Sequence, residues 1–514
     1  MAQDQQADVI AFLADPAAHD GDGPVEIIET HASLLFLAGP RVVKLKRAVR
    51  RPYLDYSTRE LRHNACLAEF RLNRRISPEL YRGVRAVWRR ADGTITYDHE
   101  DAGTGVVLDW VVVMNRFDEQ TRFDRLARRG DLTPALLIEL AGRIVDMHRH
   151  ARPTRRYGGA GGIEQVVALN ETAMAAAGID PARAGAVTRT CQGALDRLSG
   201  LLERRRRGGR VRRCHGDLHL ANLCLVEGRP TPFDCLEFDP ALGCIDVLYD
   251  LAFLLMDLGH YGLSAAANLV FNRYLDLSDE GVGDSAGLPA LPLFVGLRAV
   301  IRGHIAAAQA ATAGATVSGD VAHYLDAAQA ALAPVRRGVV AIGGLSGSGK
   351  STLARALAPR CDGLLGARVL RTDVIRKRAA GLVPEQHLPA SAYDQASQGR
   401  VYGGLIEQTV AALAAGFPVI ADAVFLQPSE RGAIAATAAA AGVPFLGLWL
   451  DIAGDQARQR IGDRVSDASD ATPAVFDFQQ RIDPGVIEWH RVDAGGGQNQ
   501  TAAAATALLT AAGF

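Results

Sequence analysis

Cysteine is scarce and scattered in this sequence. Its seven cysteines are spread over 514 residues, their number is odd, and no two of them form a CxxC pair. A disulfide framework needs paired cysteines in a small chain, and a zinc knuckle needs closely spaced ligand pairs. The sequence therefore favours neither, and we expect a protein of a reducing, cytoplasmic compartment.

Long apolar runs and an excess of one charge are also missing. No run reaches the roughly 18 apolar residues of a transmembrane helix, and the start lacks the basic region of a secretory signal. The chain has 56 Lys and Arg against 57 Asp and Glu, a net charge of -1. We therefore expect no membrane partner and no nucleic acid. A local basic run, Arg204–Arg207 with Arg212 and Arg213, reads as a solvated loop, with attraction of a phosphate as the second interpretation.

A phosphate-binding pattern is present at 344–351. This GLSGSGKS segment fits GxxxxGK[ST], follows an apolar run at 339–342 and precedes a helical pattern from Thr352. That strand–loop–helix context disfavours a chance match, because backbone N–H groups of the loop and the helix N-terminus together bind polyphosphate. We predict that Lys350 contacts the phosphates and that Ser351 ligates Mg²⁺. The predicted nucleotide-binding residues here are Gly344, Ser346, Gly347, Ser348, Gly349, Lys350, Ser351 and Thr352.

The position of this loop divides the chain. A P-loop follows the first strand of its domain, so we expect one domain over 1–335 and a P-loop domain over 336–514. With 48% hydrophobic and 22% charged residues, the chain has enough apolar surface for more than one core.

The first region is predicted to begin with strands and continue with helices. Lys44 ends a predicted strand at 41–45 and resembles the strand lysine that kinases use on ATP phosphates; Lys46 is the alternative. Glu69, on a predicted helix, could pair with that lysine or be an exposed glutamate. The other predicted strands cover 25–28, 33–37, 84–89, 94–97 and 106–114, and helices cover 58–74, 134–148, 186–204 and 294–313. This order predicts a small β-rich lobe over about 1–115 and a helical lobe over about 116–335.

The chemistry of this region is concentrated at 214–239. His215-Gly216-Asp217 is followed by Asn222, an apolar strand, a turn at Gly228 and Asp234. Phosphoryl transfer needs a carboxylate beside the acceptor hydroxyl and an Asn/Asp pair that holds Mg²⁺. A turn rich in Asp and His, or a metal site on His215, His219 and nearby cysteines, is a weaker interpretation, because no zinc spacing repeats.

This pattern, HGDxHxxN followed by a strand and an Asp, resembles the aminoglycoside phosphotransferase family of the kinase-like superfamily. The resemblance implies an α+β, bilobal protein-kinase-like fold. It also implies that Asp217 is the catalytic base, that Asn222 and Asp234 are metal ligands, that His215 supports the loop and that Asp250 is structural. Acceptor specificity in the family lies in the helical lobe, where Arg298, Arg302 and His304 could face the acceptor or an ordinary amphipathic surface.

The second region alternates strands and helices, which predicts an α/β P-loop fold with a parallel, doubly wound sheet. Two predicted strands, 367–373 and 418–422, end in Asp373 and Asp422. We predict that Asp373 acts on the acceptor hydroxyl, that Arg376 holds an anionic group and that Asp422 serves Mg²⁺; a helix N-cap is the alternative for each Asp.

The segment 455–472 resembles the arginine-bearing lid of gluconate kinase, zeta toxin and chloramphenicol phosphotransferase. The resemblance implies that Arg460 and Arg464 stabilise charge on the transferring phosphoryl group; solvated helix arginines are the alternative.

Over its full length the chain resembles bacterial fusions of an aminoglycoside-phosphotransferase-like domain with a P-loop kinase domain. The implied activity is a bifunctional phosphotransferase that uses ATP or GTP with Mg²⁺ and acts on hydroxyls of small molecules. Two alternatives stay open. One domain could bind or hydrolyse nucleotide only to regulate the other, or the chain could be a toxin-like kinase of nucleotide-sugars.

Overall fold

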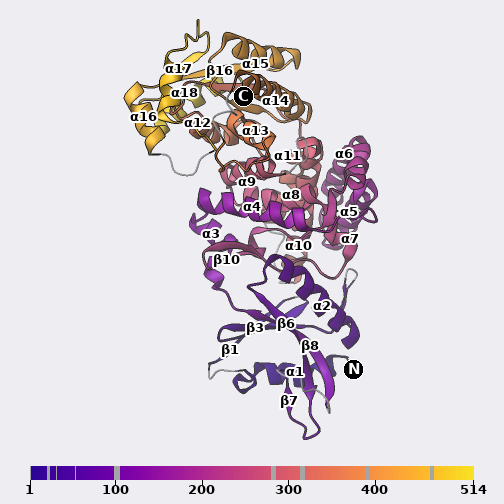
Figure 1. The fold of residues 1–514 in the computed structure, drawn as a ribbon. Coiled ribbons are helices and arrows are strands. Elements are labelled where there is room, and N and C mark those ends of the chain that lie inside the picture. Colours follow the sequence, from indigo (N-terminus) through magenta and orange to yellow (C-terminus); the bar gives the residue numbers. More distant parts are fainter. Residues whose placement is uncertain are drawn as a thin grey trace. The chain divides into compact units, whose positions relative to one another are not determined.

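The computed structural model describes residues 2–19, 23–30, 32–51, 54–97, 105–278, 285–312, 319–388, 394–463 and 468–514 (Figure 1). The chain forms two compact units, one of Met1–Gly162 with Glu203–Leu254 and the other of Ile163–Leu202 with Leu255–Phe514. The helices just before the P-loop thus group with the P-loop sheet. The division at 335/336 stays a prediction from the motifs.

The first unit is built on a six-stranded antiparallel sheet in the order β1-β2-β3-β8-β6-β7. Its strands are β1 (Val25–Glu29), β2 (Ser33–Ala38), β3 (Arg41–Lys46), β6 (Tyr81–Arg89), β7 (Ile95–Thr96) and β8 (Val106–Asn115). All six predicted strands of this region are present, although the one predicted over 94–97 is only two residues long.

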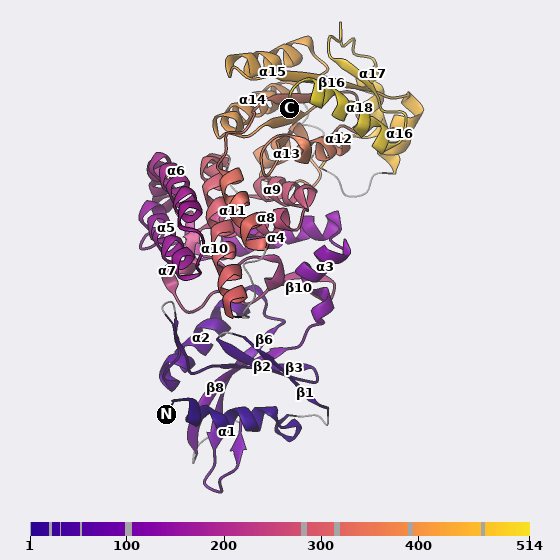
Figure 2. The same cartoon turned by 180° about the vertical axis from the view of Figure 1, so that it is seen from behind.

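Helices cover both faces of this sheet (Figure 2). On one face, α1 (Ala2–Ala14) packs Val9 and Leu13 into a core with Val43 and other strand residues. On the other face, α2 (Arg59–Ile76) packs against the core that contains Val42. Because successive side chains of a strand alternate between faces, Lys44 and Lys46 lie with Val42 on the α2 side. Helix α1 was not predicted.

The rest of the first unit surrounds the predicted catalytic loop. Two short antiparallel pairs, β9 with β12 and β10 with β11, flank that loop. The elements are β4 (Arg50–Arg51), β5 (Leu54–Asp55), α3 (Phe123–Arg129), α4 (Pro134–His150), β9 (Val211–Arg213), β10 (Leu223–Val226), β11 (Arg229–Pro232), α7 (Pro240–Gly243) and β12 (Cys244–Asp246). Three helices have residues in both units: α5 (Gly159–Ala176), α6 (Pro181–Arg207) and α8 (Val247–His260).

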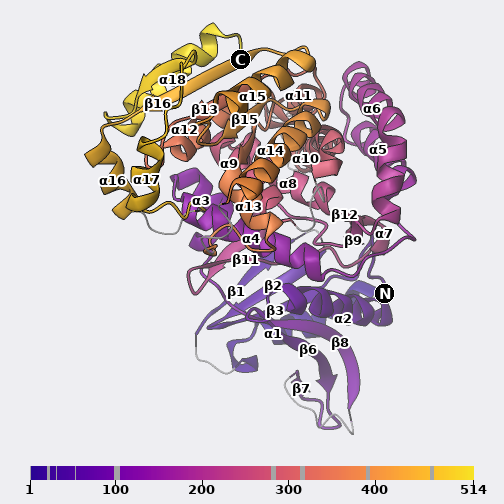
Figure 3. The same ribbon diagram turned by 45° about the horizontal axis from the view of Figure 1, so that its top comes forward.

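The second unit contains a five-stranded parallel sheet in the order β14-β15-β13-β16-β17 (Figure 3). Its strands are β13 (Val339–Gly343), β14 (Arg368–Arg371), β15 (Val419–Asp422), β16 (Phe445–Asp451) and β17 (His490–Asp493). The P-loop follows the central strand β13, where the strand order reverses and open parallel sheets bind ligands. The predicted parallel, doubly wound sheet is confirmed, and β17 is an additional strand.

Apolar cores on both faces of this sheet join it to its helices, and α9 packs at its β14 edge. The helices are α9 (Ser264–Leu277), α10 (Leu291–Thr312), α11 (Gly319–Ala331), α12 (Lys350–Leu357), α13 (Thr372–Ala379), α14 (Gln395–Ala414), α15 (Pro428–Ala440), α16 (Gly454–Gly462), α17 (Pro473–Gln480) and α18 (Gln498–Ala511).

One segment of the described chain, Ser285–Thr312, is long and apolar enough to pass a length-and-composition test for a membrane span. Most of it is buried inside the protein, and α10 within it packs closely on α11: a Cβ at Gly303 would lie 3.4 Å from the Tyr324 side chain. Packing in a protein core accounts for its composition.

Candidate active sites

A buried carboxylate fixes the predicted catalytic loop of the first unit. Asp250, on α8, accepts hydrogen bonds from the backbone N–H of His215 at 3.1 Å and of Gly216 at 2.8 Å. His148 Nε2 lies 3.0 Å from the same carboxylate. His148, Cys214 and Asp250 could converge on a metal. However, both Asp250 oxygens already accept hydrogen bonds from the loop backbone, so the geometry favours an anchor of the loop.

His215 supports the loop from within. Its Nε2 lies 2.9 Å from the Phe233 carbonyl oxygen and therefore carries the proton, while Nδ1 accepts from the Asp217 backbone N–H at 3.3 Å. Burial lowers the pKa of His215, which favours this neutral form. The ring thus connects the catalytic loop to the segment that leads into Asp234.

Asp217 and Asn222 are held together. The Asn222 side-chain amide donates to the Asp217 carbonyl oxygen and to its carboxylate, both at 2.9 Å. These two contacts use the nitrogen of the Asn222 side chain, so its amide oxygen is available to bind a cation. His219 Nε2 lies 3.4 Å from the Asp217 carboxylate. The sequence reasoning assigned His219 no role beside Asp217.

Asp234 and Lys44 meet at the next point of the site. Asp234 adopts a left-handed backbone conformation, φ 62°, which Asp tolerates better than most residues. Its carboxylate lies 2.7 Å from Lys44 Nζ, and Lys44 also reaches Glu69 at 2.8 Å. Burial disfavours the charge of Lys44, but Asp234 and Glu69 outweigh it and raise the pKa well above its usual value.

Both strand lysines pair with Glu69. Lys46 Nζ lies 2.7 Å from the second Glu69 oxygen and 2.5 Å from Glu237, which also accepts from the Tyr56 hydroxyl at 2.7 Å. Burial raises the pKa of Glu69, yet the two lysines outweigh it and lower that pKa to about 2. Glu69 therefore pairs with Lys46 as well as with Lys44, because residues two apart on β3 face the same side.

The second unit holds the P-loop in a cavity of about 1040 Å³. Lys350 Nζ donates to the Gly344 and Leu345 carbonyl oxygens, both at 2.9 Å. The Ser351 hydroxyl donates to Asp422 at 2.6 Å, so the predicted metal-binding pair is in contact. The buried Ser348 hydroxyl has no partner in the described part of the chain. The lining also contains Ser346, Gly347, Gly349 and Thr352.

Asp373 lines the same cavity but does not end a strand. Strand β14 stops at Arg371, and Asp373 lies in the first turn of α13. The N-cap of that helix is Arg371, so the N-cap alternative for Asp373 is wrong. Burial raises the pKa of Asp373. The negative charge of Asp422 raises this pKa further, whereas the nearby Arg371 opposes the shift. Arg371 Nε also lies 3.3 Å from the Asp422 carboxylate, a contact that we did not predict.

The two predicted lid arginines have different outcomes. Arg460 lines the cavity, and its guanidinium donates to the Ala494 carbonyl oxygen at 2.9 Å. Arg464 lies outside the described residues. Arg376 is buried and also lines the cavity.

The helix residues considered for the acceptor lie in the second unit. Arg298, Arg302 and His304 belong to α10, and none of them is among the described residues that line the P-loop cavity. Burial lowers the pKa of His304 to about 4. Arg298 is buried, so the interpretation as an exposed amphipathic surface is wrong for that residue, whereas His304 is half-buried.

Comparison with protein families agrees with these two sites. Residues 39–284 match the phosphotransferase enzyme family, and residues 339–482 match an AAA domain family of the P-loop type. The chain is a fusion of a phosphotransferase domain and a P-loop kinase-like domain. It is therefore an enzyme of the phosphotransferase class, as the sequence predicted.

Similar proteins span nearly the whole chain. An uncharacterized protein of Mycobacterium tuberculosis (strain ATCC 25618 / H37Rv) is 28% identical over 492 residues, which cover 92% of this chain and 93% of the relative. An uncharacterized protein of Mycobacterium bovis has the same identity and coverage.

Two solved structures are each similar to part of the chain. A choline/ethanolamine kinase family protein from Mesorhizobium loti is 14% identical and covers 64% of this chain and 95% of its own, with a TM-score of 0.40. A gluconokinase from Sinorhizobium meliloti 1021 is 21% identical and covers 34% of this chain and 94% of its own, with a TM-score of 0.26.

Proposed function

We propose that each domain transfers the γ-phosphate of ATP, or of GTP, to a hydroxyl of its own small-molecule acceptor. The observation that carries this proposal is that each unit assembles three groups: a lysine for phosphate, oxygen ligands for a cation and a carboxylate for the acceptor. In the first unit these are Lys44, Asn222 with Asp234, and Asp217. In the second they are Lys350, Ser351 with Asp422, and Asp373.

In the first unit, Asp217 accepts the proton of the acceptor hydroxyl. The Asn222 amide keeps its carboxylate oriented, as the two 2.9 Å contacts indicate. Lys44 contacts the nucleotide phosphates, because it is the lysine that touches Asp234, whereas Lys46 is only 1% exposed and is enclosed by Glu69 and Glu237. Catalysis of phosphoryl transfer consists mainly of positioning and charge stabilisation.

In the second unit, Lys350 exchanges its two loop carbonyls for phosphate oxygens. Asp373 takes the proton of the acceptor hydroxyl, a role that its raised pKa suits. Arg376 and Arg460 add positive charge to the cavity. Each can stabilise negative charge that develops on the transferred group.

The oxygen ligands of both sites fit Mg²⁺. Carboxylate, amide and hydroxyl oxygens are its preferred protein ligands, and the phosphates of the nucleotide complete the set. The unpartnered, buried Ser348 hydroxyl supports an oxyanion in the P-loop. When bound, Mg²⁺ neutralises charge on the phosphates.

The test is Mg²⁺-dependent nucleotide turnover by the full chain and by Asp217→Asn and Lys350→Gln, with a panel of aminoglycosides, sugars and nucleosides. The matched controls are Asp146→Asn and Arg336→Gln, whose side chains are 63% and 76% exposed. We expect each active-site variant to lose a different acceptor-dependent part of turnover, while the controls lose none. If Asp217→Asn changes nothing with any acceptor while Lys350→Gln removes all turnover, the first domain is regulatory and the bifunctional proposal is wrong.

A further inference from the structure

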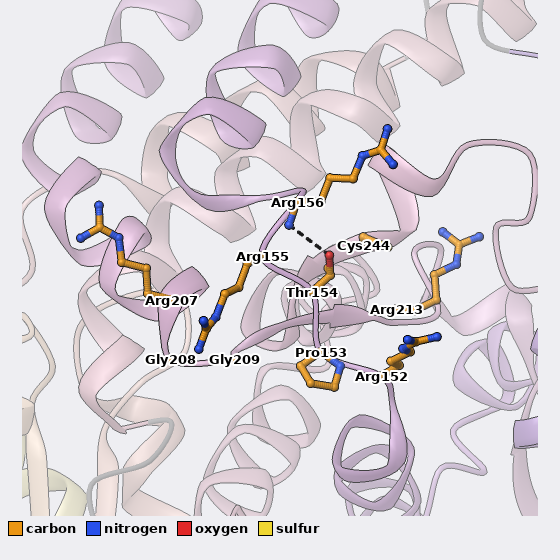
Figure 4. Close-up of a pocket in the computed structure, with 10 residues that line it drawn as sticks. All are labelled: Arg152, Pro153, Thr154, Arg155, Arg156, Arg207, Gly208, Gly209, Arg213 and Cys244. Carbon is orange, nitrogen blue, oxygen red and sulfur yellow. Dashed lines mark hydrogen bonds between the residues drawn. The ribbon is translucent and has the colours of Figure 1, made fainter.

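The basic run that the sequence assigned to a solvated loop forms part of a pocket in the first unit. Arg204–Arg207 end helix α6, and Arg212 and Arg213 lie on strand β9, so the loop interpretation is wrong. Five arginines line a cavity of about 1020 Å³: Arg152, Arg155, Arg156, Arg207 and Arg213 (Figure 4). We call this the arginine pocket. None of the residues that we assign to catalysis lines it.

The positive charge of the arginine pocket exceeds the negative charge beside it, where Glu203 interacts electrostatically with Arg207. No acidic residue is among its lining residues, and in the described part of the chain no ion pair joins Arg152, Arg155, Arg156 or Arg207 to a carboxylate. The neighbouring Glu203 is held by Arg206 at 2.7 Å. Arg205, in the same run, has a very different environment: it is buried and pairs with Asp246 at 2.7 Å. Arg205 therefore has a structural role, whereas the arginines that line the pocket are available to bind an anion.

The fifth arginine is built into the pocket wall. Arg213 donates to the backbone carbonyl oxygens of Leu236 at 2.8 Å and Asp239 at 3.4 Å, and in the described part of the chain no ion pair joins it to a carboxylate. A Cβ at Gly243 would lie 1.8 Å from its guanidinium. A glycine is therefore required for Arg213 to occupy this place.

Backbone hydrogen bonds hold the facing wall. Thr154 N–H donates to the Val211 carbonyl oxygen at 2.9 Å, and Arg213 N–H donates to that of Arg152 at 3.0 Å. The Thr154 hydroxyl in turn accepts from the Arg156 N–H at 3.1 Å (Figure 4). Because the backbone is fixed before a ligand arrives, only arginine side chains need to be ordered on binding.

We propose that the arginine pocket binds a compact oligophosphate, either a free polyphosphate or a small molecule that carries several phosphate groups. Guanidinium groups match phosphate oxygens in pairs, and several around one concavity favour clustered anionic charge over a single carboxylate. No aromatic side chain is among the described residues that line the pocket. It therefore lacks the stacking surface with which proteins bind the bases of single-stranded nucleic acid.

The first experiment maps arginine reactivity in the full chain. Phenylglyoxal modifies exposed guanidinium groups, and peptide mass spectrometry locates each modification. The probe is inorganic tripolyphosphate with EDTA. We expect modification of Arg155 and Arg207 to slow about tenfold when tripolyphosphate reaches about ten times its Kd, because only unliganded protein then reacts. Two exposed arginines of the same unit, Arg82 on β6 and Arg90 directly after that strand, should react at an unchanged rate.

The second experiment separates this pocket from the nucleotide sites, which also bind phosphate. Calorimetry with tripolyphosphate should find one site fewer in the double variant Arg155→Glu/Arg207→Glu than in the control Arg82→Glu/Arg90→Glu, which has the same change in net charge. Equal stoichiometry in the two variants would overturn the proposal. So would equal protection of all four arginines, or protection by NaCl at matched ionic strength. If single-stranded RNA protects Arg155 and Arg207 at a lower phosphate concentration than tripolyphosphate, the assignment to a compact oligophosphate is wrong.

Discussion

Lys44 and Lys46 share Glu69, yet their replacement should damage different properties. Lys46 is 1% exposed and compensates both Glu69 and Glu237, whose side chains are 0% and 10% exposed. Among the described residues, the change Lys46→Met leaves Glu237 with only the Tyr56 hydroxyl as a hydrogen-bond partner. Removing one partner of a buried ion pair costs about 3–5 kcal/mol. For a unit of this size, each kcal/mol lowers Tm by about 2–4 °C, so we expect Tm to fall by about 6–20 °C.

Lys44→Met should have a smaller effect on stability. Glu69 keeps Lys46 as a partner, and the Asp234 side chain is 44% exposed, so water can solvate it. We expect a loss below about 2 kcal/mol, within the range of ordinary substitutions. Nucleotide affinity of the first unit should fall instead, because the proposed phosphate contact is lost.

The assay combines thermal unfolding with binding of a fluorescent ATP analogue. Binding is measured in a Lys350→Ala background, so that the P-loop contributes little. Arg82→Met, an exposed change on the same sheet, is the matched control and should alter neither property. If Lys46→Met unfolds like the wild type and abolishes nucleotide binding, while Lys44→Met binds normally, the roles of the two lysines are reversed and our reasoning is wrong.

Three further predictions concern the second unit. Gly347→Ala should abolish nucleotide binding by the P-loop, since Gly347 has φ 80° and a Cβ there would lie 2.6 Å from the Ala457 carbonyl oxygen; unchanged binding would contradict this geometry. The pH–rate profile of P-loop-dependent turnover should have its acid limb above the ordinary Asp pKa of 3.8, because a base with a raised pKa becomes protonated at higher pH. An acid limb at pH 3.8 would exclude Asp373 as the base. Asn272→Leu should lower the free energy of unfolding by about 1–3 kcal/mol in urea titrations, because it leaves the Val369 N–H, now bonded to Asn272 at 2.8 Å, without a partner. Unchanged unfolding would mean that water replaces the amide.

Local patterns predicted the elements that carry the chemistry. The strand, glycine-rich loop and helix around Lys350 follow from neighbouring residues, because apolar runs, glycine and helix formers act over a few positions. The same holds for the loop from His215 to Asn222 and the turn at Gly228. Side-chain alternation could also have shown that Lys44 and Lys46 share a face, although the sequence reasoning treated them as alternatives.

The tertiary structure decided which charged groups are buried together. Lys46 with Glu237 and Arg205 with Asp246 are pairs across 191 and 41 residues, and no local pattern identifies them. Long-range contacts also decided the environments of the basic run. Helix α6 buries Arg205, whereas Arg207 lines a pocket together with the distant segment 152–156. The sequence by itself therefore determined the two phosphate-handling motifs. Only the fold decided the partners of the charges, because burial and long-range contact, not residue type, set whether a charge needs a partner.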